Sequence, residues 1–186
     1  MLSEVQRKKL THFFNILDHN GNGVLQLDDF TDVGENLCIT LGFKVDTPEH
    51  ASVINQSKKL FHRLIGDIKK NSDWNIRLNE WLEFFDREVL NAGDYSVLKY
   101  YIKLTTKYLF DLYDQDKDGN ICIEEYIDMF TIYRIDVKYS ARSFLRLDSD
   151  NNEYISKTEL VNAVADFFVT SDEEADGNWI FGNWDY

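Results

Sequence analysis

Three short segments of the chain carry a carboxylate or amide side chain at every second residue and end in a further carboxylate. The clearest runs from Asp114 to Glu125, with Asp114, Asp116 and Asp118 at positions 1, 3 and 5 and Gly119 at position 6. This spacing is typical of a twelve-residue calcium-binding loop, in which oxygens at positions 1, 3, 5, 7 and 12 surround the ion and position 6 turns sharply. The chemistry indicated is coordination of a hard divalent cation.

Two other segments follow the same spacing with one departure each. Residues 18–29 end in Asp29, where glutamate is usual, and residues 148–159 carry Glu153 at position 6, where glycine is usual. Position 7 contributes a backbone carbonyl, and Cys122, a soft sulfur at position 9, is not expected to bind calcium. The predicted ligands are Asp18, Asn20, Asn22, Val24 and Asp29 in the first loop, Asp114, Asp116, Asp118, Asn120 and Glu125 in the third, and Asp148, Asp150, Asn152, Tyr154 and Glu159 in the fourth.

A further segment in the same frame, residues 69–80, is predicted to hold no metal. It keeps Asp73 and Glu80, but Lys69 stands at position 1 and Trp74 at position 6. An ammonium group thus replaces the first anionic ligand, and a bulky indole occupies a turn that usually needs a positive φ. The protein is therefore expected to bind Ca²⁺ at three sites, with the second loop empty of metal.

Affinity rises with the charge and rigidity of the ligands, so the charged ligands rank the three loops. The third loop has four carboxylates at ligand positions and the fourth has three. In the fourth, Glu153 is expected to adopt a turn conformation that costs roughly 1 kcal/mol, about fivefold in affinity. The first loop has only Asp18 and the short Asp29, which makes bidentate contact harder and favours competition by Mg²⁺ there.

Each loop lies between two segments with apolar residues at helical spacing, which would place the loops between helices. The apolar positions are Phe14, Leu17 and Phe30; Ile65, Ile68 and Trp81; Phe110, Tyr113 and Tyr126; and Phe144, Leu147 and Leu160. Spacings of three and four put these residues on one face of a helix, toward a shared core. Position 8 of the loops holds Leu25, Ile76, Ile121 and Ile155, which can pair as short β bridges. We expect an all-α fold of four helix–loop–helix units in two packed lobes.

The loop starts at residues 18, 69, 114 and 148 indicate two pairs of units. We expect a lobe at 1–92 with the degenerate second loop, a lobe at 93–170, and a tail at 171–186. Turn chemistry at 91–94 favours the connection there, and Pro48 is expected to open a helix. The tail carries Trp179, Ile180, Phe181 and Trp184, too apolar to stay in water, and is expected to dock on the body.

Composition excludes several classes of protein. The net charge of −13 and a pI near 4.6 leave no basic patch for nucleic acid. Residues 3–9 are polar where a secretory segment would be apolar, and no apolar stretch approaches the length of a membrane span. Cys38 and Cys122 show no redox, disulfide or zinc spacing. We expect a cytoplasmic monomer without membrane insertion.

The chain resembles the sarcoplasmic calcium-binding protein and calexcitin family of EF-hand proteins over nearly its whole length. Three features carry the resemblance: the opening L-S-E-V-Q-R-K-K-L before the first loop, the decay of the second loop alone, and the ending F-F-V-T-S-D-E-E-A-D-G-N-W-I-F-G. The last is the most specific, since G-N-x-x-F-G is not part of the general EF-hand pattern. The resemblance implies two lobes that pack on each other and a role in calcium buffering or calcium signalling.

Three functions are compatible with these features. A Ca²⁺/Mg²⁺ buffer is favoured over a sensor that exposes an apolar surface to a target protein, because only Met1 and Met129 are methionines whereas many core positions are aromatic. A luciferin-binding protein or photoprotein has the same architecture, but photoproteins end in proline and this chain ends in tyrosine. No enzyme motif is found, and His12, His19, His50 and His62 lie at unrelated spacings. We therefore expect no enzymatic activity.

Overall fold

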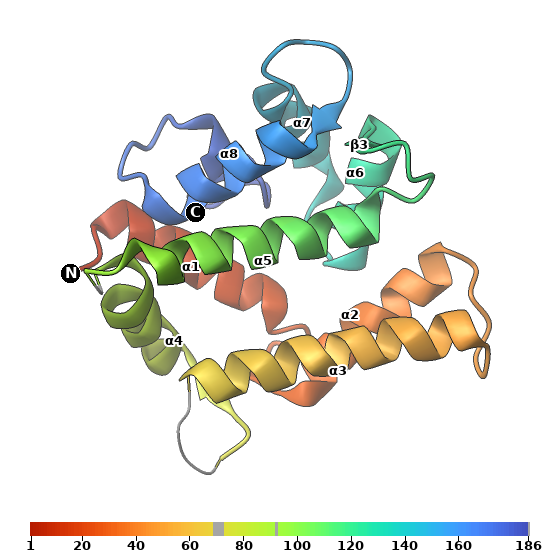
Figure 1. Ribbon diagram of the computed structural model, residues 1–186, viewed down its shortest axis with the longest axis horizontal. Helices are drawn as coiled ribbons and strands as arrows, with labels where there is room; N and C mark the ends of the chain where they lie inside the picture. The colour runs from red at the N-terminus through yellow and green to blue at the C-terminus, as the bar shows by residue number, and fades with distance from the viewer. Residues whose placement is uncertain (69–72, 92, 186) are drawn as a thin grey trace.

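The computed structural model describes residues 1–68, 73–91 and 93–185, and this part of the chain is mostly helical (Figure 1). Its α-helices are α1 (Glu4–Leu17), α2 (Leu27–Thr40), α3 (Pro48–Ile68), α4 (Leu78–Phe84), α5 (Tyr95–Tyr113), α6 (Ile123–Ile132), α7 (Ser140–Leu147) and α8 (Lys157–Val169). A π-helix, η1 (Phe85–Leu90), continues α4, and two 3₁₀ turns are η2 (Val137–Tyr139) and η3 (Asp176–Trp179). Four two-residue strands are β1 (Val24–Leu25), β2 (Ile76–Arg77), β3 (Asn120–Ile121) and β4 (Ile155–Ser156).

The ends of the helices coincide with the ends of the predicted metal loops. Asp18, Asp114 and Asp148 are the C-caps of α1, α5 and α7, and each donates its backbone N–H to a carbonyl one turn earlier. The last residue of each loop is the third residue of the next helix, as in α8, where Glu159 and the N-cap Ser156 form a capping box. The residues that would bind metal therefore also start and stop the helices.

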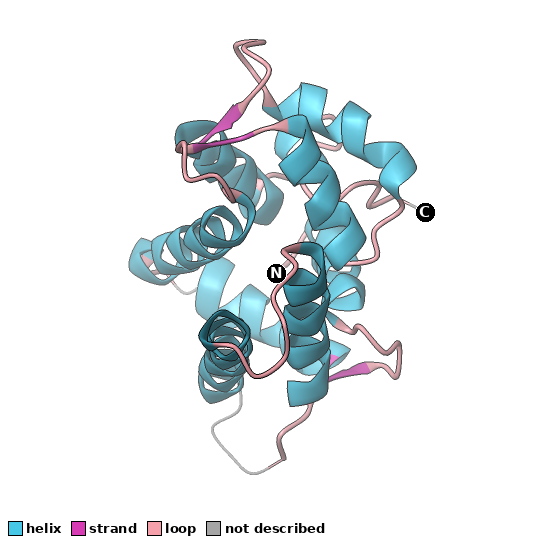
Figure 2. Ribbon diagram, turned by 90° about the vertical axis from the view of Figure 1, so that its right-hand side faces the viewer, coloured by secondary structure: helices cyan, strands magenta, loops and turns pink. Residues whose placement is uncertain are grey.

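The loops pair in twos, as the apolar residues at position 8 predict. β1 is antiparallel to β2 with Leu25 opposite Ile76, and β3 is antiparallel to β4 with Ile121 opposite Ile155. The two sheets lie at opposite ends of the molecule in Figure 2. The predicted all-α fold of paired helix–loop–helix units is confirmed, as is the start of α3 at Pro48.

Aromatic side chains join the two halves of the chain in one core. The Phe13 ring of α1 stacks on Phe181 of the tail with centroids 4.7 Å apart, and Phe85 of η1 stacks on Phe168 of α8 at 5.5 Å. Because stacked rings of this kind bury large apolar areas, the lobes form one packed body, as predicted. The proposed boundary at residue 92 falls on a residue outside the described ranges and stays a prediction.

The segment after α8 folds back over this core. Ile180 is fully buried and Phe181 is 2% exposed. The Tyr126 hydroxyl of α6 donates to the Ile180 carbonyl at 2.9 Å, and the His12 imidazole of α1 lies 2.9 Å from the Phe181 carbonyl. The tail thus contacts the first helix of the chain and the helix that follows the third loop.

A buried lysine on α1 connects this tail with the end of α8. Lys9 has no exposed side-chain surface, and its Nζ donates to the carbonyls of Asp166 and Thr170 at 3.1 and 3.0 Å and to Asn178 Oδ1 at 2.7 Å. Lys9 thereby joins the C-terminal end of α8 to α1, since a lysine ammonium can donate to the last carbonyls of a helix. Burial lowers the pKa of Lys9 to about 8.

This lowered pKa predicts a pH-dependent contribution of Lys9 to stability. Between about pH 8 and 10.5 the unfolded chain keeps a proton that the folded chain has lost, so the free energy of unfolding should rise with pH. Measured against Lys9→Met, wild-type stability should rise by at most about 3 kcal/mol over that range. Thermal unfolding at several pH values tests this prediction. Lys8→Met, which changes the exposed lysine next to Lys9, is the control. A constant difference between wild type and Lys9→Met would contradict it.

Candidate metal centres

The third loop folds around the oxygens of its alternate residues. Asp114 Oδ2 accepts the N–H of Gly119 at 3.2 Å, Asp116 Oδ1 accepts that of Asp118 at 3.0 Å, and Asp118 Oδ1 accepts that of Asn120 at 2.7 Å. In each of these bonds, a backbone N–H inside the loop points toward a carboxylate. One oxygen from each of the three aspartates lies within 4.8 Å of the others. Such a group of anionic oxygens is the ligand set that Ca²⁺ prefers.

The fourth loop repeats this arrangement. Asp148 accepts the N–H groups of Asn152 and Glu153 at 3.0 and 2.9 Å, and Asn152 Oδ1 accepts that of Tyr154 at 2.9 Å. Carboxylate oxygens of Asp148, Asp150 and Glu159 lie within 4.8 Å of one another. Here the structure brings positions 1, 3 and 12 together.

The first loop has the same backbone with fewer charges. Asp18 accepts the N–H groups of Asn22 and Gly23 at 3.1 and 2.7 Å, and Asn22 Oδ1 accepts that of Val24 at 3.0 Å. Asn20 Oδ1 accepts the same Asn22 N–H at 3.0 Å. Neutral amide oxygens thus take the places that Asp116 and Asp118 hold in the third loop.

The carboxylate at position 12 closes each of these loops from the helix that follows. Glu125 accepts the N–H groups of Gln115 and Cys122 at 2.8 and 2.9 Å, one on each oxygen. Glu159 likewise accepts those of Ser149 and Ser156, both at 2.8 Å. Burial acts to raise the pKa of Glu159, but the hydrogen bonds from these serines outweigh it and lower the pKa. A carboxylate held ionised in this way is ready to bind a cation.

Asp29 occupies the same position with a shorter side chain and deeper burial. Its oxygens accept the N–H groups of Asn20 and Gln26 at 3.2 and 2.8 Å, and its side chain has no exposed surface. Burial raises its pKa, although the hydrogen bonds oppose this shift. The negative charge of Asp29 is therefore costly without a cation beside it.

Position 6 has a left-handed backbone in all three loops. The φ angles are 83° at Gly23, 88° at Gly119 and 71° at Glu153. The positive φ expected at Glu153 is confirmed. Position 4 is also left-handed, with φ 62° at Lys117 and 57° at Asn151. Sequence reasoning missed this second turn, although Gly21 at position 4 of the first loop is its signal.

In the described part of the second loop, an arginine that sequence reasoning also missed lies between two carboxylates. Lys69, the expected substitute for the first ligand, lies outside the described residues. The Arg77 guanidinium at position 9 lies 3.1 Å from Asp73 Oδ2 and 3.8 Å from Glu80 Oε2, the carboxylates at positions 5 and 12. Trp74 at position 6 does not adopt the positive φ that Gly23 and Gly119 have at the same position; its indole is 64% exposed and packs edge-on against His62.

A small apolar cavity lies between the two halves of the molecule. Its volume is about 60 Å³, and its wall includes Phe13, Trp81, Phe85, Tyr101 and Phe168. Ligand sites in proteins usually have about 300–1,000 Å³. This cavity is therefore far smaller than a typical site for an organic ligand.

Comparisons with known proteins agree with the calcium-loop geometry described above. A family model described as EF hand matches residues 107–130, the third unit. Clytin from Clytia gregaria is 26% identical over 176 residues, covering 91% of this chain and 84% of clytin. No helix in the described part is both long and apolar enough to cross a bilayer.

Two solved structures share the fold over nearly the whole chain. The coelenterazine-binding protein from Renilla muelleri, in its calcium-loaded apo form, has a TM-score of 0.77 at 18% identity and covers 98% of this chain and 99% of its own. A sarcoplasmic calcium-binding protein from amphioxus has a TM-score of 0.72 at 15% identity with the same coverage. The third unit thus matches the EF-hand model, and the fold of the chain is similar to that of the sarcoplasmic calcium-binding protein, a resemblance that its sequence predicted.

Proposed function

We propose that the protein binds three Ca²⁺ ions, at the first, third and fourth loops, and acts as a cytoplasmic, monomeric Ca²⁺/Mg²⁺ buffer. The observation that carries this proposal is that the three loops share one set of internal hydrogen bonds. In each, the residues at positions 1, 3 and 5 accept backbone N–H groups from inside the loop, and position 12 closes it. The ligands proposed are those predicted from the sequence.

The charges of the loops support an order of affinity. The third loop combines Asp114, Asp116, Asp118 and Glu125 with glycine at position 6, which favours the tightest site. The fourth has fewer charges and the strained Glu153. The first has two carboxylates, one of them the short Asp29, and is the site at which Mg²⁺ should compete best.

The packing of the helices and tail favours a buffer over a sensor. Sensors expose flexible, often methionine-rich surfaces, but Met129 is 3% exposed, and the apolar residues beside the loops pack into the common core. Ile180 and Phe181 of the tail are buried in the same core. We propose that residues 171–186 cover the two lobes, 1–92 and 93–170, permanently rather than leaving when calcium binds.

A luciferin-binding or photoprotein function is the second candidate. The apolar cavity between the halves and the likeness to the coelenterazine-binding protein favour it. The volume of about 60 Å³ opposes it, since a drug-sized ligand needs several times more space. Emission of light after coelenterazine and then calcium are added would establish this second function.

Calcium titration at physiological Mg²⁺ in the presence of an apolar-surface dye tests the buffer proposal. We expect three bound Ca²⁺ ions and a flat or falling dye signal, because the tail stays on the core. A saturable rise in dye fluorescence would contradict the closed buffer and identify a sensor for a target protein. Fewer than three ions would contradict the proposed stoichiometry.

Glu125→Gln should remove the tightest calcium site, since position 12 supplies two oxygens of the predicted ligand set and closes the loop. Glu124→Gln is the matched control, because the Glu124 side chain is adjacent to Glu125 in sequence, is exposed and lies outside the ligand set. Calorimetric titration should show the first binding step lost only in Glu125→Gln. The same tight step in both variants would overturn the ranking.

Glu153→Gly should tighten the fourth site by about fivefold, because glycine adopts a φ of 71° without strain of roughly 1 kcal/mol. Glu153→Gln keeps the strained backbone and removes the charge, so it separates the two effects. The fourth-site affinity of each variant is measured by calcium titration in the Glu125→Gln background. Equal affinities for the glycine and glutamine variants would contradict a role for backbone strain.

A further inference from the structure

A chain of side-chain amides connects the second loop with a predicted ligand of the first. Asn22 Nδ2 donates to Gln26 Oε1 at 3.1 Å, and Gln26 Nε2 donates to Asn75 Oδ1 at 2.6 Å. The Asn22 amide nitrogen is thereby directed to Gln26, which leaves Oδ1 on the side of the loop that accepts the Val24 N–H. Asn75, in a loop proposed to bind no metal, therefore fixes the orientation of a ligand in a loop proposed to bind one.

The backbone of the first loop is fixed from the same side. Val24, whose carbonyl is the predicted ligand at position 7, pairs with Arg77, and Leu25 pairs with Ile76. Leu25 and Ile76 have no exposed surface. The position of the Val24 carbonyl thus depends on where β2 lies.

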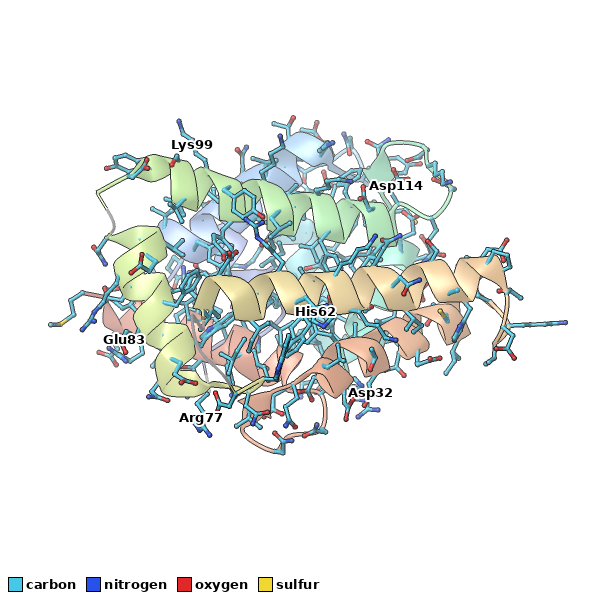
Figure 3. All side chains as sticks on the ribbon, turned by 60° about the horizontal axis from the view of Figure 1, so that its bottom comes forward. Asp32, His62, Arg77, Glu83, Lys99 and Asp114 are labelled. Atoms are coloured by element: carbon cyan, nitrogen blue, oxygen red, sulfur yellow. The ribbon has the colours of Figure 1, made fainter. Side chains whose placement is uncertain are left out.

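Arg77 in turn links two carboxylates in the described part of the second loop, residues 73–80. Its guanidinium stands between the carboxylates of Asp73 and Glu80, and its backbone N–H donates to Glu80 at 2.9 Å. In the other loops, the residues at these positions are predicted to face a divalent ion. Arginine donates from a rigid, always charged group, so it can join positions 5 and 12 at any calcium concentration. Figure 3 shows Arg77 at the end of α4, well away from Asp114 of the third loop.

The first loop has the greatest need of such support. With two carboxylates it attracts calcium less strongly than the third loop, so its affinity depends more on how well its ligands are placed beforehand. Residues that orient ligands without touching the metal commonly change metal affinity by about 10–100-fold. A partner segment that Arg77 holds together at any calcium concentration removes the cost of ordering that segment when calcium binds.

We propose that residues 73–80 of the second loop, held together by Arg77 without an ion, support the first calcium site, with Asn75, Gln26 and Arg77 as the positioning residues. This rests on the proposal that the first loop binds calcium. In the other pair each loop is itself a calcium site, so the order of one depends on the occupancy of the other. The first site should instead bind calcium independently of any ion in its partner.

The test uses the full chain with Glu125→Gln and Glu159→Gln, which silences the third and fourth loops. In this background, Asn75→Ala and Arg77→Gln should each weaken calcium binding at the first loop by roughly tenfold. Asn79→Ala and Arg87→Gln are matched controls: Asn79 is an exposed asparagine of α4, and Arg87 makes an exposed ion pair with Glu83. Both should change the affinity by less than about twofold.

A conservative variant separates positioning from simple destabilisation. Asn75→Asp keeps the acceptor for Gln26, and Asn79→Asp adds the same charge to α4. We expect Asn75→Asp to bind calcium within about twofold of Asn79→Asp, whereas Asn75→Ala loses affinity. Equal losses in Asn75→Asp and Asn75→Ala would overturn the role of the amide chain.

The remaining outcomes distinguish the two proposals. Normal calcium binding in Asn75→Ala and Arg77→Gln would overturn the support role and leave the first calcium site in place. No calcium binding by the Glu125→Gln, Glu159→Gln background would overturn the first site itself, and the support role with it.

Discussion

The carboxylate at position 12 is the constraint on which the loops depend. It belongs to the helix after the loop, yet it accepts backbone N–H groups from both ends of the loop, as Glu125 does from Gln115 and Cys122. Because the same residue is the third residue of a helix, its hydrogen bonds both close the loop and cap the start of the helix. Any ion that draws this carboxylate inward would also act on the following helix, which is how such loops connect metal binding to helix packing.

In this protein those helices have little freedom to move. The stacked pairs Phe13–Phe181 and Phe85–Phe168 hold the two halves together, and Tyr126, on the helix after the third loop, donates to the tail. Lys9 adds three hydrogen bonds between α1, the end of α8 and the tail. Opening one loop pair would have to disturb contacts of the other half. This mutual packing is the physical reason for favouring a closed calcium buffer.

The second loop, which we propose to be metal-free, still pairs with the first loop in the fold. The β bridge to the first loop needs only the backbone and two apolar residues, Leu25 and Ile76. Arg77, a cation that belongs to the chain, forms ion pairs with both Asp73 and Glu80. A second loop without metal would therefore still pair with the first loop through this bridge.

The sequence by itself determined the features that depend on short-range spacing. The predicted ligand positions, the helix ends and the apolar residue at position 8 of each loop all lie within a twelve-residue frame, and the apolar residues at three- and four-residue intervals define the helix faces. Only the tertiary structure decided which distant residues meet. Lys9 and Asn178 are 169 residues apart, and Gln26 and Asn75 are 49 apart. Arg77 bridges residues close to it in sequence, but only the folded loop brings its guanidinium between them. Such contacts follow from the packing of whole helices, which leaves no periodic signal in the chain.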